Sequence, residues 1–385
     1  MSIGRKLKMG MVGGGPGAFI GDIHRKAAAL DGLIETVCGC FSSDPAKSKE
    51  TGRQLYLPEN RIYGTFEEMI EKESSLPTDE KMDFIAIATP NYLHFQPAML
   101  ALRHGFHVVC DKPMTISVEE ALQLVQEVKK SGLLFCLTHN YTGYPLVKEA
   151  RERVINNELG NIRKIVAEYP QGWLAEKLEE TGNKQAGWRA DPAKSGVGGA
   201  LGDIGTHAAN LAEYISGLKI NEVFADLSSF VSGRKLDDDC NLLVRFNNGA
   251  RGVIYASQIS VGEENGLKIR VYGEKASLTW VQLEPNSLLI SYNDKPSQLL
   301  KPGLGKGYLS KNINHYTRLP GGHPEGFIEA FANIYKAFAT DLLCYKSKIA
   351  TPTWVDYPTV EDGLHGMKFM EAVVASSSEK KWVSI

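Results

Sequence analysis

The sequence predicts an α/β protein of two domains: a doubly wound parallel sheet, then an α+β domain with one large, mostly antiparallel open sheet. Three observations lead to this fold class. Apolar β-like runs alternate with helical spacings over the first 140 residues, runs separated only by turns dominate the rest, and 385 residues suffice for two ordinary cores. The predicted domains are residues 1–140 and 141–385, with the option that the last helix packs back on the first domain.

The composition favours small-molecule chemistry over nucleic-acid or membrane binding. The formal net charge is -2, and no block of lysine and arginine is present. No apolar run approaches the ~18 residues that span a bilayer, and the N-terminus lacks the apolar core of a signal peptide. Six cysteines lie mostly in apolar runs without a C-x-x-C pair, which indicates reduced core thiols. We therefore expect a cytoplasmic protein.

Strands and helices are expected to alternate through the first domain. The predicted strands are Leu7–Val12, Glu35–Phe41, Met82–Ala88, His107–Cys110 and Leu133–Leu137. The predicted helices are Ile20–Leu30, Pro45–Leu55, Phe66–Glu73, Leu93–His104 and Val118–Ser131. This alternation predicts ligand binding at the carboxyl ends of the strands.

A glycine-rich turn follows the first predicted strand and matches G-x-G-x-x-A at Gly13, Gly15 and Ala18. Glycines let backbone amides approach a phosphate, and the following helix offers unpaired N–H groups and the positive end of its dipole. The strand–turn–helix context favours a Rossmann dinucleotide site over a simple tight connection. The predicted cofactor contacts in this turn are Gly13, Gly15, Pro16, Gly17, Ala18 and Phe19.

The end of the second predicted strand bears on the choice between NAD and NADP. NAD-preferring folds usually place a carboxylate there, whereas a 2′-phosphate needs hydroxyls, amides and a cation. Ser42 and Ser43 occupy this place, and Lys47 begins the next helix, so the local chemistry slightly favours NADP. The alternative is that Ser42 to Asp44 cap that helix, and both interpretations can hold together.

Two further strand ends are expected to contact the nicotinamide end of the cofactor. Their residues are Thr89, Pro90, Asn91 and His94 after the third long strand, and Asp111 and Lys112 after the fourth. A lysine locked by a following proline can place a cation beside a reacting oxygen, where charge develops. It can equally be part of a simple turn, and the residues alone leave both open.

The second domain is expected to be rich in antiparallel strands. The predicted strands are Arg163–Trp173, Glu222–Val231, Cys240–Phe246, Ala250–Ser257, Leu267–Gly273, Ser277–Val281 and Ser287–Tyr292. The predicted helices are Tyr144–Asn157, Thr206–Ser216, Glu325–Phe338 and Glu361–Ala375. A hairpin is expected at Asn247–Gly249. A sheet this size cannot leave an apolar face in water, so we expect the same sheet of another subunit to cover it.

Asp203 and His207 are four residues apart and are expected to project from one face of a helix. A carboxylate that touches an imidazole can fix its tautomer and suit it to proton transfer near neutral pH. A capping aspartate and a buried, satisfied histidine are the alternative. The spacing of the nine histidines matches no zinc pattern, so no metal is predicted.

Together the glycine turn, T-P-N-x-x-H from Thr89, D-K-P from Asp111 and D-x-G-x-H from Asp203 resemble the glucose-fructose oxidoreductase/inositol dehydrogenase family (Gfo/Idh/MocA) over nearly the full length. The family's E-K-P motif appears here as D-K-P, which keeps Lys112. The resemblance implies a two-domain NAD(H)- or NADP(H)-dependent enzyme acting on carbohydrates, inositols or related polyols, assembled as a homodimer or homotetramer through its C-terminal sheet. NADP-using members carry serine and a cation where Ser42 and Lys47 stand, so the preference for NADP becomes moderate.

The resemblance also implies a catalytic set of Lys112, Asp203 and His207. Further predicted substrate contacts are Asn140, Tyr141, Tyr169 and Arg189, although Arg189 can instead pair with a carboxylate. Tyr169, Gln171 and Trp173 are expected to alternate on one strand and to share a face.

The predicted mechanism has His207 taking the hydroxyl proton, Asp203 orienting His207, and Lys112 stabilising the charge on the substrate oxygen. Two other functions stay open. One is a non-catalytic NAD(P)-binding sensor or interaction protein, and the other is a sugar isomerase, epimerase or lyase that recycles its bound cofactor.

Overall fold

The computed structural model describes residues 4–385, which divide into two compact units. Unit 1 contains the chain up to Asn140 together with Phe331–Leu364. Unit 2 contains Tyr141–Ala330 and His365–Ile385. In the described residues, no helix is both long and apolar enough to cross a membrane.

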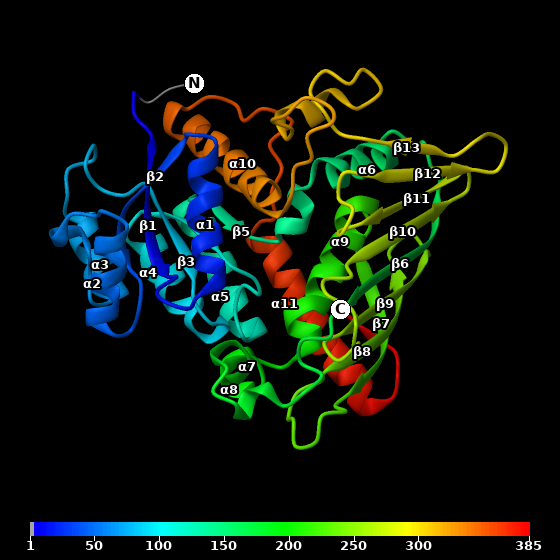
Figure 1. Ribbon diagram of the computed structural model, residues 1–385, viewed down its shortest axis with the longest axis horizontal. Helices are drawn as coiled ribbons and strands as arrows, with labels where there is room; N and C mark the ends of the chain where they lie inside the picture. The colour runs from blue at the N-terminus through cyan, green and yellow to red at the C-terminus, as the bar shows by residue number, and fades with distance from the viewer. Residues whose placement is uncertain (1–3) are drawn as a thin grey trace. The chain divides into compact units, whose positions relative to one another are not determined.

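A five-stranded parallel sheet forms the centre of unit 1, which confirms the predicted first fold (Figure 1). The strand order is β2-β1-β3-β4-β5, and the two halves wind outward from β1 and β3. The strands are β1 (Leu7–Gly13), β2 (Ile34–Cys40), β3 (Phe84–Ala88), β4 (His107–Cys110) and β5 (Phe135–Leu137). All residues of β3 and β4 are buried, as expected for central strands covered on both faces.

Helices connect these strands, as the alternating pattern predicts. They are α1 (Phe19–Leu30), α2 (Pro45–Gln54), α3 (Phe66–Ser74), α4 (Phe95–Arg103) and α5 (Val118–Ser131). Their ends follow local chemistry: the side chain of Ser117 caps α5 by accepting from the amide of Glu120, and Gly132 ends it with a φ of 67°. Short 3-10 turns η1 (Glu59–Arg61) and η2 (Asn91–Leu93) complete the connections.

Residues 331–364 belong to unit 1, although the sequence analysis assigns them to the second domain. They include most of α10 (Phe327–Ser347) and the start of α11 (Val360–Glu379). The ring of Phe338 packs edge-on against Phe84 of β3, with ring centroids 5.1 Å apart. An apolar helix reveals its period in the sequence but not the sheet that it will cover.

A nine-stranded, mostly antiparallel sheet forms unit 2, as predicted, and its order is β13-β12-β11-β10-β6-β9-β8-β7-β14. The strands are β6 (Ile162–Pro170), β7 (Ile220–Ser228), β8 (Asp239–Phe246), β9 (Arg251–Ser257), β10 (Lys268–Gly273), β11 (Ala276–Val281), β12 (Leu288–Tyr292), β13 (Gln298–Leu300) and β14 (Val383–Ser384). Among the described strands of this sheet, only β6 and β9 pair in parallel. The hairpin predicted at Asn247–Gly249 joins β8 to β9 and is confirmed.

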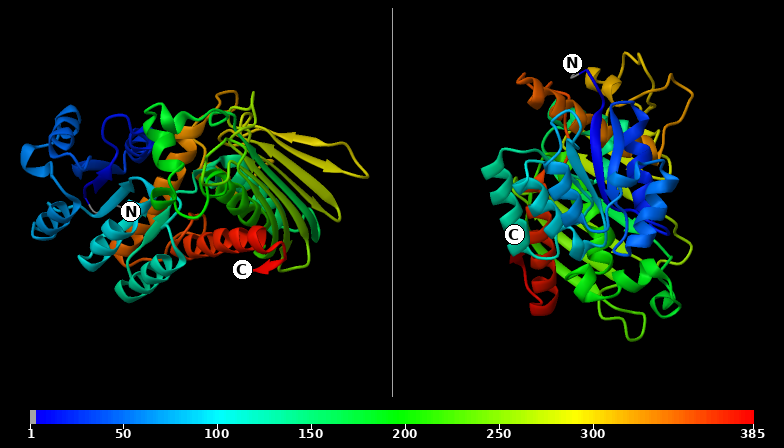
Figure 2. Two further views of the ribbon diagram at one scale, coloured as in Figure 1. Left: turned by 90° about the horizontal axis from the view of Figure 1, so that it is seen from below. Right: turned by 90° about the vertical axis from the view of Figure 1, so that its left-hand side faces the viewer.

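Helix α9 (Thr206–Ser216) packs on one face of this sheet, against β6, β9 and β10. Figure 2 shows the strands as a fan with helices of unit 2 on one side only. On the covered face the side chains of β8 and β10 are buried at every second residue. Within the described residues of unit 2, the opposite face carries no helix.

The helical segments before and between the strands of unit 2 comprise two regular helices, α6 (Pro145–Ile155) and α9, and several short or irregular turns. They are η3 (Asn140–Gly143), α6 (Pro145–Ile155), η4 (Leu178–Glu180), α7 (Lys184–Arg189), α8 (Pro192–Ser195), η5 (Leu201–Gly205), α9 (Thr206–Ser216) and η6 (Lys311–His315). Helix α9 has the predicted bounds, and the αL residue Gly217 ends it. The prediction for β6 was wrong at its end, because the strand stops at Pro170 and leaves Gln171 and Trp173 in the following loop.

Candidate active site

The turn between β1 and α1 fits a pyrophosphate. A Cβ on Gly13 would lie 2.5 Å from the carbonyl oxygen of Ala88, and one on Gly15 would lie 2.5 Å from that of Phe41. Only glycine therefore fits either position without a backbone shift. Ala18 at the N-cap of α1 has no side-chain acceptor, so the first amides of the helix remain for an anionic ligand.

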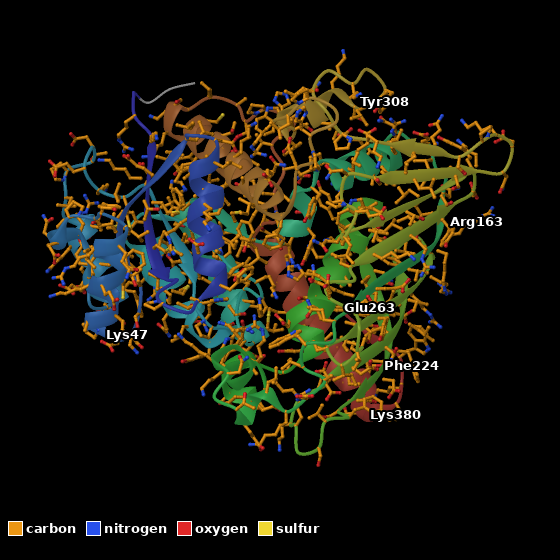
Figure 3. The ribbon with its side chains drawn as sticks, in the orientation of Figure 1. Lys47, Arg163, Phe224, Glu263, Tyr308 and Lys380 are labelled. Atoms are coloured by element: carbon orange, nitrogen blue, oxygen red, sulfur yellow. The ribbon has the colours of Figure 1, made fainter. Side chains whose placement is uncertain are left out.

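The end of β2 combines a helix cap with a cation. The carboxylate of Asp44 accepts from the amide of Ala46 over 2.9 Å, and Ser42 Oγ accepts from the amide of Asp44 over 3.1 Å. The capping interpretation therefore holds. Lys47 Nζ lies 3.9 Å from Asp44 Oδ2, and both side chains are exposed. Lys47 is labelled in Figure 3, beside α2. An ion pair as exposed as that of Lys47 with Asp44 is weak, so the ammonium group of Lys47 can still bind a 2′-phosphate.

The loops after β3 and β4 are joined by His94, whose side chain is fully buried. Its Nδ1 lies 2.7 Å from the carbonyl oxygen of Pro113, and its Nε2 lies 2.9 Å from that of Thr89. Burial lowers the pKa of His94, against the effects of Asp111 and the two carbonyls, which raise it. The ring thus connects the T-P-N-x-x-H loop to the D-K-P loop.

Asp111 fixes the backbone next to Lys112. Its Oδ1 accepts from the amide of Lys112 over 2.9 Å and from Thr138 Oγ1 over 2.9 Å. Among the described residues, two polar atoms that follow strands of the same sheet are buried without a hydrogen-bond partner: Thr89 Oγ1 after β3 and Asn140 Nδ2 after β5. Buried polar atoms are rarely left unpaired in a finished structure, so both atoms suit a ligand.

The glycine-rich segment before Asp203 is held by Asp237. The two carboxylate oxygens of Asp237 accept from the amides of Gly199 and Leu201, each over 2.7 Å. A Cβ on Gly199 would lie only 2.1 Å from the carbonyl oxygen of Asp237. The segment then forms η5, one stretch of π-helix that carries Asp203 and runs directly into α9. Such stretches are frequent at functional sites.

Asp203 is held by two side chains from different parts of unit 2. Its Oδ2 accepts from Arg189 Nε over 3.1 Å and from Gln258 Nε2 over 2.8 Å. The structure therefore places Arg189 on a carboxylate, which is the alternative that the sequence leaves open for it. Gln258 lies directly after β9 and was missed, since a single amide side chain forms no motif.

His207 stands in the first turn of α9 and is 6 % exposed. The ring of Tyr141 meets it edge-on, with centroids 4.8 Å apart and an interplanar angle of 83°. Tyr169 lies 6.2 Å away, and its hydroxyl is hydrogen-bonded to that of Tyr141. Burial raises the pKa of both phenols, so both keep their protons at neutral pH. Unit 2 thus brings four predicted residues together: Tyr141, Tyr169, Asp203 and His207.

Two more residues of this cluster were missed by the sequence analysis. Asn265 accepts at Oδ1 from the hydroxyl of Tyr169 over 2.6 Å and donates from Nδ2 to the hydroxyl of Tyr141 over 3.2 Å. Its Nδ2 also donates to Gln282 Oε1 over 3.0 Å. No local pattern marks these amides, although both lie at the ends of predicted strands. The described residues contain no group of three or more potential metal ligands.

A glycine-rich turn between β1 and α1, a strand-terminal lysine and the D-x-G-x-H residues Asp203 and His207 fit one class of protein, the NAD-binding oxidoreductases. The family comparisons agree. Residues 7–141 match the model described as "Oxidoreductase family, NAD-binding Rossmann fold", and residues 147–279 match that of the GFO/IDH/MocA C-terminal domain. The chain belongs to the Gfo/Idh/MocA family.

Similar proteins cover three quarters or more of the chain. An uncharacterized oxidoreductase of Bacillus subtilis, YfiI, is 31% identical over 99% of this chain and 97% of its own. The crystal structure of an inositol dehydrogenase homolog from Azotobacter vinelandii, complexed with NADH and myo-inositol, is 33% identical, with a TM-score of 0.92 over 99% of this chain and 98% of that one. Levoglucosan dehydrogenase of Pseudarthrobacter phenanthrenivorans is 27% identical over 75% of this chain and 77% of its own.

Proposed function

We propose that this protein transfers hydride between a nicotinamide cofactor and a hydroxyl or carbonyl group of a sugar, inositol or related polyol. One observation carries the proposal: Asp203 and His207 of the D-x-G-x-H motif lie among aromatic rings and amide side chains in unit 2. Such groups recognise polyols, because rings pack on C–H faces and amides bond to hydroxyls. The named substrates of the relatives, myo-inositol and levoglucosan, belong to this class.

Each unit supplies part of the proposed chemistry. When bound, the nicotinamide supplies the hydride acceptor or donor. His207 takes the proton of the substrate hydroxyl during oxidation and returns it during reduction. Asp203, itself held by Arg189 and Gln258, supports the imidazole. Lys112 donates a hydrogen bond to the substrate oxygen and stabilises the charge that develops there.

The cofactor proposal has two parts: that the protein binds a nicotinamide dinucleotide, and that it prefers NADP to NAD. The turn at Gly13 and Gly15 fits the pyrophosphate of either dinucleotide. Ser42, Ser43 and Lys47 support NADP as the preferred cofactor, because hydroxyls and a cation suit a 2′-phosphate. Against this preference, the related Azotobacter structure holds NADH. Thr89, Pro90, Asn91 and Asp111 are proposed to complete the cofactor site.

The substrate contacts proposed are Lys112, Asn140, Tyr141, Tyr169, Arg189, Asp203 and His207. Asn140 is supported by its buried, unpaired Nδ2. The support for Arg189 is indirect, since its Nε already donates to Asp203. His94 is the weakest cofactor contact, because both of its ring nitrogens face backbone carbonyls.

A homo-oligomer through the bare face of the nine-stranded sheet is also proposed. The strand register places one side chain from each of eight strands in a single row across this face. The row is Phe224, Leu243, Val253, Val166, Arg270, Thr279, Leu289 and Leu299. Six of its eight members are apolar, and Phe224 is labelled in Figure 3. A largely apolar row on an open face, here interrupted by Arg270 and Thr279, is typical of a protein interface.

The reducing compartment expected from the sequence is supported by the cysteines, all six of which are buried thiols. This supports the expectation of a cytoplasmic protein.

The test of the proposed function is a screen followed by single-turnover kinetics. Myo-inositol, other inositols, aldoses and levoglucosan are offered with NAD+ and with NADP+, and reduced nicotinamide is followed by absorbance. On an accepted substrate, Lys112→Ala and His207→Ala are expected to slow hydride transfer by at least about 100-fold. The matched controls are Lys129→Ala and His104→Ala. Hydride transfer at the wild-type rate in Lys112→Ala or His207→Ala would refute the role of that residue, and failure to bind either cofactor would refute the whole proposal.

A further inference from the structure

A connected set of amide, phenol and indole side chains runs through unit 2 and ends beside His207. Trp173 Nε1 donates to Gln171 Oε1 over 3.1 Å, and Gln171 Nε2 donates to Asn265 Oδ1 over 2.8 Å. The hydroxyl of Tyr169 donates to the same Asn265 oxygen over 2.6 Å. These residues come from the end of β6, the loop after it, and the segment just before β10.

The indole of Trp173 fixes the direction of this chain of hydrogen bonds. An indole N–H can only donate, so the atom of Gln171 that faces it must be the amide oxygen. The amide nitrogen of Gln171 then faces Asn265, which must offer its own oxygen there. Rotating either amide by 180° would place two donors or two acceptors against each other, and such unmade hydrogen bonds are costly.

The same reasoning fixes the protons near His207. The hydroxyl proton of Tyr169 is committed to the Asn265 oxygen, so in the bond between the two phenols it is Tyr141 that donates. Asn265 Nδ2 completes a closed ring by donating to the oxygen of Tyr141 over 3.2 Å. Hydrogen bonds that all run in one direction around a ring strengthen one another.

A second series of hydrogen bonds leads from Asn265 through Gln282 to the hydroxyl of Tyr144, and its donors are fixed in the same way. Asn265 Nδ2 also donates to Gln282 Oε1 over 3.0 Å, which leaves Gln282 Nε2 to donate to the hydroxyl of Tyr144 over 3.3 Å. All four hydrogen-bonding positions of Asn265 are therefore used. One donor-only side chain, Trp173, sets the orientation of every group in the network.

Trp173 also contacts the arginine that is hydrogen-bonded to Asp203, the carboxylate of the D-x-G-x-H motif. Its ring lies 5.9 Å from the guanidinium of Arg189, within the range of a cation–π contact. Arg189 Nε in turn donates to Asp203. The ring of Trp173 therefore packs towards the partner of Asp203, while its N–H controls the phenol that packs edge-on against His207.

We propose that Trp173 is a positioning residue for the proton-transferring histidine: its indole N–H sets the direction of the network that holds Tyr141 against His207. The inference rests on the proposed function, because it assigns His207 the proton transfer. In this arrangement the protons of Tyr141 and Tyr169 are both committed within the ring. The two phenols accept hydrogen bonds from a substrate and orient the imidazole, and they do not donate to the substrate.

The test removes the N–H and keeps a ring. Trp173→Phe leaves an aromatic face for Arg189 but frees Gln171 to rotate, so both directions of the network become accessible. We expect kcat for an accepted polyol to fall about tenfold while KM stays within about twofold, since displacing His207 affects proton transfer more than substrate binding. Gln171→Glu has no donor at all and is expected to invert the network, with a larger loss of kcat.

Trp188→Phe is the matched control. The Trp188 ring lies 4.2 Å from the same guanidinium, and its N–H donates to Gln185 Oε1, which also accepts from Arg189 Nη1 but takes no part in the amide–phenol bonds described above. We expect wild-type kcat. Wild-type kcat in Trp173→Phe would overturn the proposal. An equal loss in the two tryptophan variants, or a raised KM with unchanged kcat in Trp173→Phe, would overturn it too, because each indicates lost packing or a direct substrate contact.

A second readout needs no substrate. In protein labelled with 15N-histidine, the ring-nitrogen resonances of His207 are identified by their loss in His207→Asn. We expect Trp173→Phe, but not Trp188→Phe, to shift them. Resonances unchanged in Trp173→Phe would contradict the inference. If the polyol screen fails, the proposed function falls while these spectra still decide whether the network reaches His207. If Trp173→Phe does not fold, Gln171→Glu carries the same test.

Discussion

The Nε atom of Arg189 donates to Oδ2 of Asp203 over 3.1 Å, so the carboxylate of the D-x-G-x-H motif is already paired with a cation. The two side chains are 23% and 15% exposed, which makes this a largely desolvated pair. Arg189 thus stabilises the charge of Asp203, and Gln258 fixes the same oxygen. The carboxylate is anchored from two sides by residues outside its own helix.

Replacing Arg189 is therefore expected to cost both stability and activity. In Arg189→Gln the Asp203 carboxylate loses a charged donor, which should lower the free energy of unfolding by about 1.5–3 kcal/mol. Single-turnover hydride transfer should slow by about tenfold or more.

The matched control for Arg189→Gln is Arg163→Gln. The Arg163 side chain pairs with Glu274 over the same 3.1 Å but is 69% exposed, so solvent screens this pair and Arg163→Gln should lose less stability than Arg189→Gln. Thermal unfolding and rapid-mixing kinetics measure both quantities. Equal losses of unfolding free energy in the two variants would show that burial does not make the Arg189–Asp203 pair more stabilising than an exposed pair.

Gly15→Ala should weaken dinucleotide binding. The added Cβ would lie 2.5 Å from the carbonyl oxygen of Phe41, so the turn must move away from β2 and its amides must leave the phosphate position. We expect the Kd for the preferred dinucleotide, measured by fluorescence titration, to rise at least about tenfold.

Gly366→Ala is the control for this substitution. It adds the same methyl group in α11, where no atom lies within 4 Å of the new Cβ. It should leave the Kd unchanged and raise the free energy of unfolding by up to about 1 kcal/mol, because alanine favours a helix. Unaltered dinucleotide affinity in Gly15→Ala would show that the turn does not cradle the phosphates.

The spacing of apolar residues predicted most of the helices and strands, because it marks the face of each segment that must be buried. Helix α9 has the predicted bounds Thr206–Ser216, since its apolar stripe is regular and glycine ends it. The five parallel strands were predicted for the same reason. Residues 331–364 group with unit 1 in the structure, whereas the sequence places them after the start of the second domain, because an apolar helix face fits any apolar sheet face of similar shape.

The candidate site was predictable only where motifs exist. Asp203 and His207 stand four residues apart, so the sequence could place them within one helical segment, where η5 runs into α9. Gln258 and Asn265 could not be placed in the site: Gln258 contacts a residue 55 positions away, and Asn265 contacts Tyr169 from 96 positions away. A lone amide carries no signal of its partner, since only the folded sheet brings the strand ends together.

Ser42→Asp should change cofactor selectivity. A carboxylate at the end of β2 repels a 2′-phosphate and can accept from the ribose 2′-hydroxyl. We expect the ratio of kcat/KM for NADP+ to that for NAD+ to fall at least about tenfold. Lys47→Gln should lower kcat/KM for NADP+ alone, with NAD+ as the internal control. An unchanged ratio in both variants would exclude this strand end as the 2′-phosphate site.

Stability should fall steeply below neutral pH because of three buried histidines in unit 1. Burial lowers the pKa of His24, His107 and His139 from 6.5 to about 4. The unfolded chain takes up protons near pH 6.5, where the folded histidines stay neutral, so the free energy of unfolding falls between about pH 6.5 and pH 4. Each histidine accounts for about 3 kcal/mol of this loss.

His107→Asn tests this pH dependence directly. His107 Nδ1 accepts from the amide of Leu134 over 2.9 Å, and an asparagine oxygen can accept in its place without titrating. Denaturant unfolding at a series of pH values should show a slope reduced by about one proton between pH 6 and pH 5. A slope equal to that of the wild type would mean that His107 is not neutral in the folded protein.

Leu243→Glu should break the proposed oligomer. Leu243 is 49% exposed near one end of the eight-residue row, where Val253 and Phe224 are its cross-strand neighbours. A carboxylate buried against a second copy would be unpaired, and its desolvation opposes association. We expect sedimentation velocity at micromolar concentration to show a dimer or tetramer for the wild type and smaller species for this variant. Leu30→Glu, at a leucine 45% exposed in unit 1, should sediment like the wild type. A wild-type monomer would remove the proposed interface, because an uncovered row of six apolar side chains would then be compatible with a stable single chain.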